Sequence, residues 1–264
     1  MIGGLDDVRA RLAAPADKAA RPIIKLLKAA VEVHQSLDGG NDVQTVLNDV
    51  MSLAKPRAAA WKHARLEWDE SFMALSGVIL TCRNPYSWLL AMFSRPYHHI
   101  GRRIDDLSTF ITTPWLTIPR ERMEAAVASP AALWSAKQAA ALQFSERAKI
   151  PTRSLPIEVF LADPVASLGA VLEGFGHSSE GLAAIETNTK SNEPLAKLQK
   201  RHKVDPWRDW LTAAQVANFN AHLDAEVVQA SGYSIEKASD YPDRLTAKHA
   251  ESLANYVNTR RNQP

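Results

Sequence analysis

The chain has 264 residues, of which 46% are hydrophobic and 23% are charged. The length allows one large domain or two small ones, and this composition is ordinary for a globular protein with enough apolar material for a sizeable core. The formal net charge of +2 argues against a general nucleic-acid binder, so an anion-binding role must come from local clusters of basic residues.

Cysteine content and apolar runs exclude several further classes. Cys82 is the one cysteine, so neither an intrachain disulfide nor a zinc site closed by thiolates can form. No apolar run reaches the roughly 18 residues that a membrane span requires. The first residues lack the basic and apolar regions of a secretory signal, and we therefore expect a cytoplasmic protein.

Residues 1–55 are predicted to be helical. Apolar residues recur at helical spacing over 23–33 and again over 43–53, with Asp38-Gly39-Gly40 between the two segments. The apolar face that these residues form over 23–33 could pack against a partner, including a second copy of the chain. We expect a helical N-terminal segment over 1–56.

Strand and helix signals alternate after residue 57. Short apolar runs at 58–61, 76–82 and 155–161 are strand candidates, the last weakened by Pro156. Helices are predicted over 86–95, 131–148, 165–174, 213–230 and 243–260 from their caps and apolar spacing. This order favours an α/β fold with a short parallel sheet surrounded by many helices, and the low strand count leaves a mostly helical protein as the alternative.

Arg83 follows the strand candidate 76–82, and Asn84-Pro85 then turns the chain into a helix. Ligands of open parallel sheets bind beyond the carboxyl ends of the strands, and a helix N-terminus there favours anions. The planar guanidinium of Arg83 suits a phosphate. The alternative is that Arg83 only pairs with a nearby carboxylate.

Two other segments carry groups suited to phosphate chemistry. Lys62 and His63 follow the strand candidate at 58–61, where His could act as a general base and Lys could stabilise a leaving phosphate. The run Lys200-Arg201-His202-Lys203 could bind a phosphate. The alternatives are a surface Lys-His pair and a solvated charge run.

Five blocks together resemble the bacterial P-loop-type sulfotransferases that use phosphoadenosine phosphosulfate (PAPS). Residues 83–90 (Arg-Asn-Pro-Tyr-Ser-Trp-Leu-Leu) with 95–98 are similar to the segment that binds the 3′-phosphate of PAPS. The other blocks, in the family's order, are 61–63 with 68–70, 129–137, 158–164, and 207–212 with the basic residues before it.

The resemblance implies a nucleoside-kinase-like domain over 57–233, followed by a helical C-terminal tail over 234–264. Arg83, with Lys200 and Arg201, would bind the 3′-phosphate. His63 would deprotonate a hydroxyl acceptor, such as a small molecule or a saccharide, and Lys62 would stabilise charge near the transferred group. PAPS would be the co-substrate, and the family's chemistry requires no metal.

Two departures from the family pattern concern its phosphate contacts. Residues 1–60 contain no loop of the Pro-Lys/Arg-Ser-Gly-Thr-Thr type, whose amides hold the 5′-phosphosulfate. The Ser that the family places eight residues after its phosphate-binding Arg is Ala91 here. The chain could therefore be an incomplete enzyme, an enzyme in which the N-terminal helices replace the loop, or a catalytically inactive relative that acts as a binding or assembly module.

Overall fold

The computed structural model describes residues 64–68, 70–96, 99, 103–117, 121–123, 126–184, 186–187, 194–197, 199 and 206–261. The predicted N-terminal helices and the strand at 58–61 lie outside these residues. So do four of the five predicted site residues, Lys62, His63, Lys200 and Arg201.

The described elements alternate between helices and two short strands. In chain order they are η1 (Glu70–Ala74), β1 (Val78–Cys82), α4 (Pro85–Ser94), α5 (Leu107–Thr112), α6 (Pro130–Arg147), β2 (Thr152–Pro156), α7 (Ile157–Ala162), α8 (Pro164–Glu173), η3 (Pro206–Trp210), α10 (Ala213–Asn220), α11 (Ala225–Ala230), η4 (Ala238–Asp240) and α12 (Ala247–Arg261). The protein is therefore α/β, with a small sheet and many helices.

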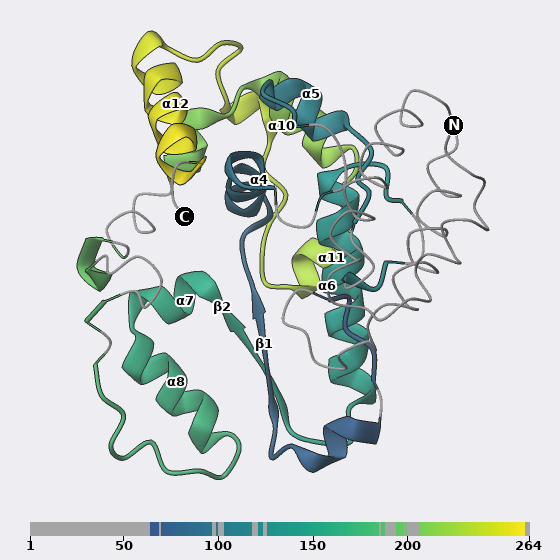
Figure 1. Ribbon diagram of the computed structural model, residues 1–264, viewed down its shortest axis with the longest axis vertical. Helices are drawn as coiled ribbons and strands as arrows, with labels where there is room; N and C mark the ends of the chain where they lie inside the picture. The colour runs from purple at the N-terminus through teal and green to yellow at the C-terminus, as the bar shows by residue number, and fades with distance from the viewer. Residues whose placement is uncertain are drawn as a thin grey trace, which may run out of the picture.

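β1 and β2 pair in parallel, with Val78 opposite Thr152 and Cys82 opposite Pro156. The chain crosses from one strand to the other through α4, α5 and α6 (Figure 1). Parallel strands require such a crossover, and the ends of both strands consequently lie at the same edge. The predicted strand at 76–82 and the parallel sheet are confirmed.

The predicted strand at 155–161 is confirmed only for its first two residues, because β2 ends at Pro156 and residues 157–162 form α7. Pro156 has no N–H for the strand ladder, and the chain leaves the sheet at this residue. A short apolar run does not distinguish a strand from a helix by its pattern alone, and Leu161 is buried in α7 as it would have been in a strand.

Side-chain caps set the helix starts that the sequence predicts. Ser129 Oγ accepts the Ala132 N–H at the start of α6, and Asp163 Oδ1 accepts the Ala166 N–H at the start of α8. Thr212 caps α10 as predicted. The predicted helix over 213–230 is two helices, because α10 ends at Asn220 and Asp224 caps α11.

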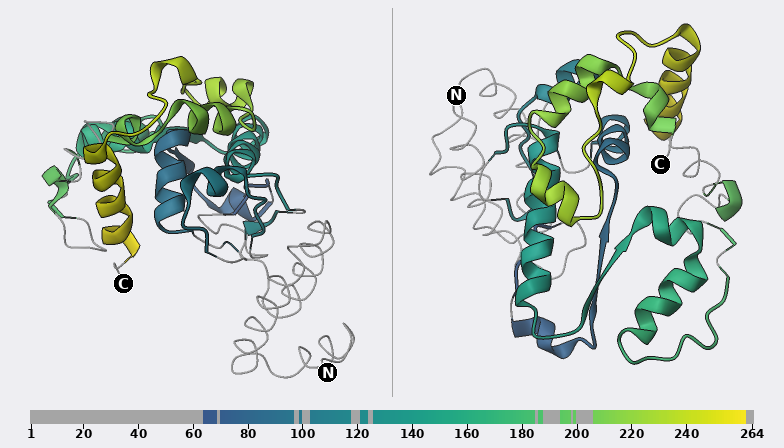
Figure 2. Two further views of the ribbon diagram at one scale, coloured as in Figure 1. Left: turned by 90° about the horizontal axis from the view of Figure 1, so that it is seen from above. Right: turned by 180° about the vertical axis from the view of Figure 1, so that it is seen from behind.

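The principal core lies among the helices at the carboxyl end of the sheet. Figure 1 and Figure 2 show α4, α5, α10 and α12 beyond this end of the sheet, with α6 running along one side of the strands and α7 and α8 on the other side. Tyr86, Trp115 and Leu133 are almost completely buried here. The C-terminal helix contributes Val257 to the same cluster, and its Tyr256 ring lies 4.8 Å from that of Trp210.

Several large apolar side chains at and beside the sheet remain exposed to solvent. Ile79 is 38% exposed on β1, and Val159 is 52% exposed on α7. The other exposed side chains of this kind are Met73, Leu75 and Val165. Parallel sheets are normally covered on both faces, so an exposed Ile79 on β1 departs from the usual burial of such strands.

None of the helices in the described ranges combines the length and the apolar character that a membrane span needs.

The Ser129 cap gives a direct test of how α6 begins. Ser129 is fully buried, and Ser129→Ala leaves the Ala132 N–H without its acceptor. We expect the free energy of unfolding to fall by about 1 kcal/mol in urea denaturation. Ser252→Ala, at an exposed position on α12, serves as the control and should change it by less than about 0.5 kcal/mol. Equal losses in the two variants would contradict the capping role.

Candidate functional site

The two strand ends bring together residues that are far apart in the sequence. Arg83 and Asn84 follow β1, and Glu158 lies two residues beyond β2. Glu158 Oε1 accepts the backbone N–H of Asn84 at 3.0 Å. This bond ties the first turn of α7 to the start of α4, at the edge where parallel sheets usually bind ligands.

Arg83 is held from three helices. The Trp134 indole of α6 donates to its carbonyl oxygen at 3.0 Å, and its own Nε donates to Ser87 Oγ of α4 at 2.8 Å. Its side chain also makes a hydrogen bond with Tyr256 of α12. Because a guanidinium carries five N–H groups, donors remain for a further acceptor.

The surroundings of Arg83 disfavour its charge. Burial lowers the pKa of Arg83, as does the charge of Arg260 on α12, while Tyr256 and Glu158 oppose the shift. None of the described ion pairs includes Arg83. The charge of Glu158 acts on Arg83, but its carboxylate bonds to the Asn84 N–H and the Tyr233 hydroxyl. The alternative in which Arg83 pairs with a nearby carboxylate therefore does not describe this site.

The N-terminus of α4 is not open to an anion, in contrast to the sequence-based expectation. Asn84 Oδ1 accepts the N–H groups of both Tyr86 and Ser87, and the Trp88 N–H bonds to the Asn84 carbonyl. Pro85 has no N–H. Anion binding at this edge therefore depends on side chains rather than on free helix amides.

Tyr233 completes the contacts of Glu158. Its hydroxyl donates to Glu158 Oε2 at 2.8 Å and lies 3.6 Å from Cys82 Sγ. Burial raises the pKa of both Tyr233 and Cys82, so the phenol and the thiol stay protonated at neutral pH. We infer that this trio fixes the strand ends and that Cys82 is not a nucleophile.

Two serines of α4 have distinct roles, and neither occupies the position of Ala91. Ala91 is buried in the helix. Ser94 Oγ donates back to the Ala91 carbonyl, which commits this hydroxyl to the helix end. Ser87 positions the Arg83 side chain. Of the two, only Ser87 contributes to the site.

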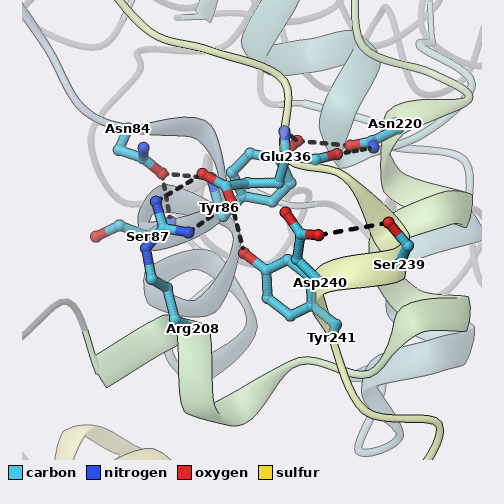
Figure 3. A network of polar contacts seen from close by, with 9 residues as sticks. All are labelled: Asn84, Tyr86, Ser87, Arg208, Asn220, Glu236, Ser239, Asp240 and Tyr241. Atoms are coloured by element: carbon cyan, nitrogen blue, oxygen red, sulfur yellow. Dashed lines mark hydrogen bonds and ion pairs between the residues drawn. The ribbon is translucent and has the colours of Figure 1, made fainter.

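A polar network joins the start of α4 to the C-terminal region (Figure 3). The Tyr86 hydroxyl donates to Asn220 Oδ1 at 2.6 Å and accepts the Glu236 N–H at 2.8 Å. Asn220 Nδ2 donates to the Glu236 carbonyl at 2.8 Å. Burial raises the pKa of Tyr86 to about 12, so the hydroxyl keeps the proton that this network needs.

Glu236 links the same network to η3. Its carboxylate receives two hydrogen bonds from Arg208, of 2.5 and 2.7 Å, and one of 3.0 Å from the Tyr241 hydroxyl. The neighbouring Trp207 ring stacks on Tyr86, with centroids 5.3 Å apart. The block at 207–212, which resembles the family's C-terminal motif, therefore packs against Tyr86 at the start of α4, close to Arg83 in the sequence.

Sequence reasoning named Arg83 but missed most of its neighbours. The structure adds Trp134, Glu158, Tyr233 and Tyr256 to the site. Glu158 could have been found, because parallel strand ends share one edge. No pattern in the polar terminal helix predicted that Tyr256 would reach Arg83.

The chain matches no family model, no curated protein and no solved structure. The geometry of the site and the resemblance of its motifs are therefore the two indications of its function.

His99 packs against an aromatic side chain of the core. Its ring lies 4.4 Å from that of Trp115, and its Nε2 is buried without a hydrogen-bond partner in the described part of the chain. The described residues contain no group of His, Cys, Asp or Glu side chains suited to a metal. Burial lowers the pKa of His99 to about 4.

This burial predicts a loss of stability in mild acid. An unfolded histidine binds a proton near pH 6.5, so between about pH 6.5 and 4 the unfolded state holds the extra proton and stability falls as pH falls. We expect the free energy of unfolding to decrease by about 1 kcal/mol per pH unit in this window. His99→Phe should reduce the slope, whereas His222→Gln, at an exposed position, should keep it. An unchanged slope in His99→Phe would refute the assignment.

Substitutions at the two ends of the network in Figure 3 should lower the free energy of unfolding by different amounts. Tyr86→Phe leaves Asn220 Oδ1 and the Glu236 N–H without their partner, which should cost about 1–3 kcal/mol of unfolding free energy. Arg208→Gln should cost less than about 1 kcal/mol, because the Arg208 side chain is 50% exposed. Urea denaturation of both variants measures this, and the reverse order would contradict it.

Proposed function

We propose that this protein binds PAPS and transfers its sulfuryl group to a hydroxyl acceptor, such as a small molecule or a saccharide. One observation carries the proposal: the Arg83 guanidinium lies at the carboxyl end of β1, partly buried, with no ion-pair partner among the described residues. A fixed, planar guanidinium is suited to a phosphate, and the 3′-phosphate of PAPS is the group that the sequence resemblance assigns to it.

The proposed reaction is an in-line displacement at sulfur. The acceptor oxygen forms a bond to sulfur as the bond from sulfur to the 5′-phosphate oxygen breaks, and adenosine 3′,5′-bisphosphate leaves. His63 would take the acceptor proton, and Lys62 would stabilise charge near the transferred group. Lys200 and Arg201 would join Arg83 at the 3′-phosphate. These four roles, and the cytoplasmic location, remain predictions from the sequence.

A second candidate function is a non-catalytic binding or assembly module. It is favoured by the exposed apolar side chains of η1, β1, α7 and α8, which Val159 and Met73 exemplify at 52% and 54% exposure. An apolar surface of this kind often marks contact with a partner. The absence of the family's phosphate loop from residues 1–60 supports the same alternative.

Nucleotide titration distinguishes the two functions. We expect adenosine 3′,5′-bisphosphate to raise the melting temperature of the wild-type protein, and Arg83→Gln to weaken its binding about 10- to 100-fold, because a charge-assisted bond contributes roughly 1.5–3 kcal/mol. Arg147→Gln, which removes an exposed arginine from the end of α6, should bind as the wild type does. If millimolar nucleotide does not change the melting temperature of the wild-type protein, the second candidate is favoured.

A further inference from the structure

The last turn of α12 is fixed beside Arg83. Arg261 forms an ion pair with Asp105 at 3.1 Å, and its guanidinium carbon lies 5.3 Å from the centre of the Phe93 ring on α4. One turn earlier, Tyr256 bonds to Arg83 itself. Arg260 lies between these residues in the sequence and is close enough for its charge to act on Arg83.

Arg260 differs from Arg261 in what surrounds it. The guanidinium carbon of Arg260 lies 5.5 Å from the centre of the Tyr256 ring. Its Nε is buried without a hydrogen-bond partner among the described residues, as is Nη2 of Arg261. Arg260 forms no ion pair with a described carboxylate, whereas Arg261 forms one with Asp105. A buried donor without an acceptor is costly and usually has a structural or functional reason.

Arg83 and Arg260 both approach Tyr256, and their positive charges are close enough to act on one another. Each charge disfavours the other, as the lowered pKa of Arg83 reflects, after the larger effect of burial. The carboxyl end of α12 tolerates a cation, but the helix dipole alone does not supply the missing acceptor. An anion between the two guanidiniums would supply it and would remove the repulsion.

We propose that Arg260 is the second cation of the Arg83 site and that the pair binds a phosphate monoester. The nucleotide identity of this ligand rests on the proposed function, but the anion site itself does not. Two guanidiniums match the double charge of a phosphate monoester, and each can bond to it through more than one N–H. The C-terminal helix would thereby supply a phosphate contact beyond Lys200 and Arg201.

Stability with and without ligand separates this role from a purely structural one. We compare wild type, Arg260→Gln and Lys248→Gln, which removes a charge from an exposed position on the same helix. Melting temperatures are measured in chloride, in inorganic phosphate at equal ionic strength, and with adenosine 3′,5′-bisphosphate or adenosine 5′-monophosphate. Tyr256→Phe, which keeps the ring against Trp210 and Arg260, serves as a second variant.

We expect Arg260→Gln to melt at the same temperature as wild type or higher in chloride, because the repulsion of Arg83 is gone. It should bind the bisphosphate at least tenfold more weakly and lose the preference for the bisphosphate over the monophosphate. Lys248→Gln should resemble wild type throughout. Tyr256→Phe should weaken the binding by less than Arg260→Gln does.

Each failure has a distinct meaning. If Arg260→Gln lowers the melting temperature equally in all solutions, or binds the bisphosphate as tightly as wild type while Arg83→Gln does not, then Arg260 is structural and the inference is overturned, although the proposed function stands. If inorganic phosphate stabilises wild type over Arg260→Gln but neither nucleotide binds, then the anion site stands and the PAPS proposal fails. If no anion stabilises the wild type, both fail.

Discussion

Parallel pairing of β1 with β2 is the constraint on which the rest of the site depends. It brings the residues after Cys82 and those after Pro156 to one edge, although 74 positions separate Asn84 from Glu158. The bond between these two residues then fixes where α4 and α7 begin. Arg83 is the residue between the end of β1 and Asn84, the N-cap of α4. Its backbone therefore has little freedom, and its side chain emerges at that edge.

The helices complete the site from outside the sheet. α6 fixes the Arg83 backbone through Trp134, α4 fixes its Nε through Ser87, and α12 approaches through Tyr256. The C-terminal region is attached by the Tyr86 and Glu236 network as well as by packing. Because α12 packs against Trp210 of η3, the presence of Tyr256 and Arg260 beside Arg83 depends in part on the network that holds η3 against α4.

Local signals predicted the parts of the fold that local chemistry controls. Caps at Ser129, Asp163 and Thr212 mark helix starts, and the β-branched run before Arg83 marks β1. The run after Leu155 was misread because its apolar pattern suits either element. Tyr256 and Arg260 were not predictable, since their helix is mostly polar and its position results from long-range contacts with α4 and η3. The free helix amides expected at α4 are absent because Asn84 caps its own helix.

That cap also determines how acidity should act on the candidate site. With the amides of Tyr86 and Ser87 taken by Asn84, the anion would meet side chains such as those of Arg83 and Arg260, which keep their charge across the physiological range. At these two arginines, a change of affinity with pH would then come from the ligand. A phosphate monoester loses its second charge below about pH 6, while an inorganic sulfate does not. Selectivity between these two anions would therefore shift toward sulfate in acid, although neither arginine loses its charge.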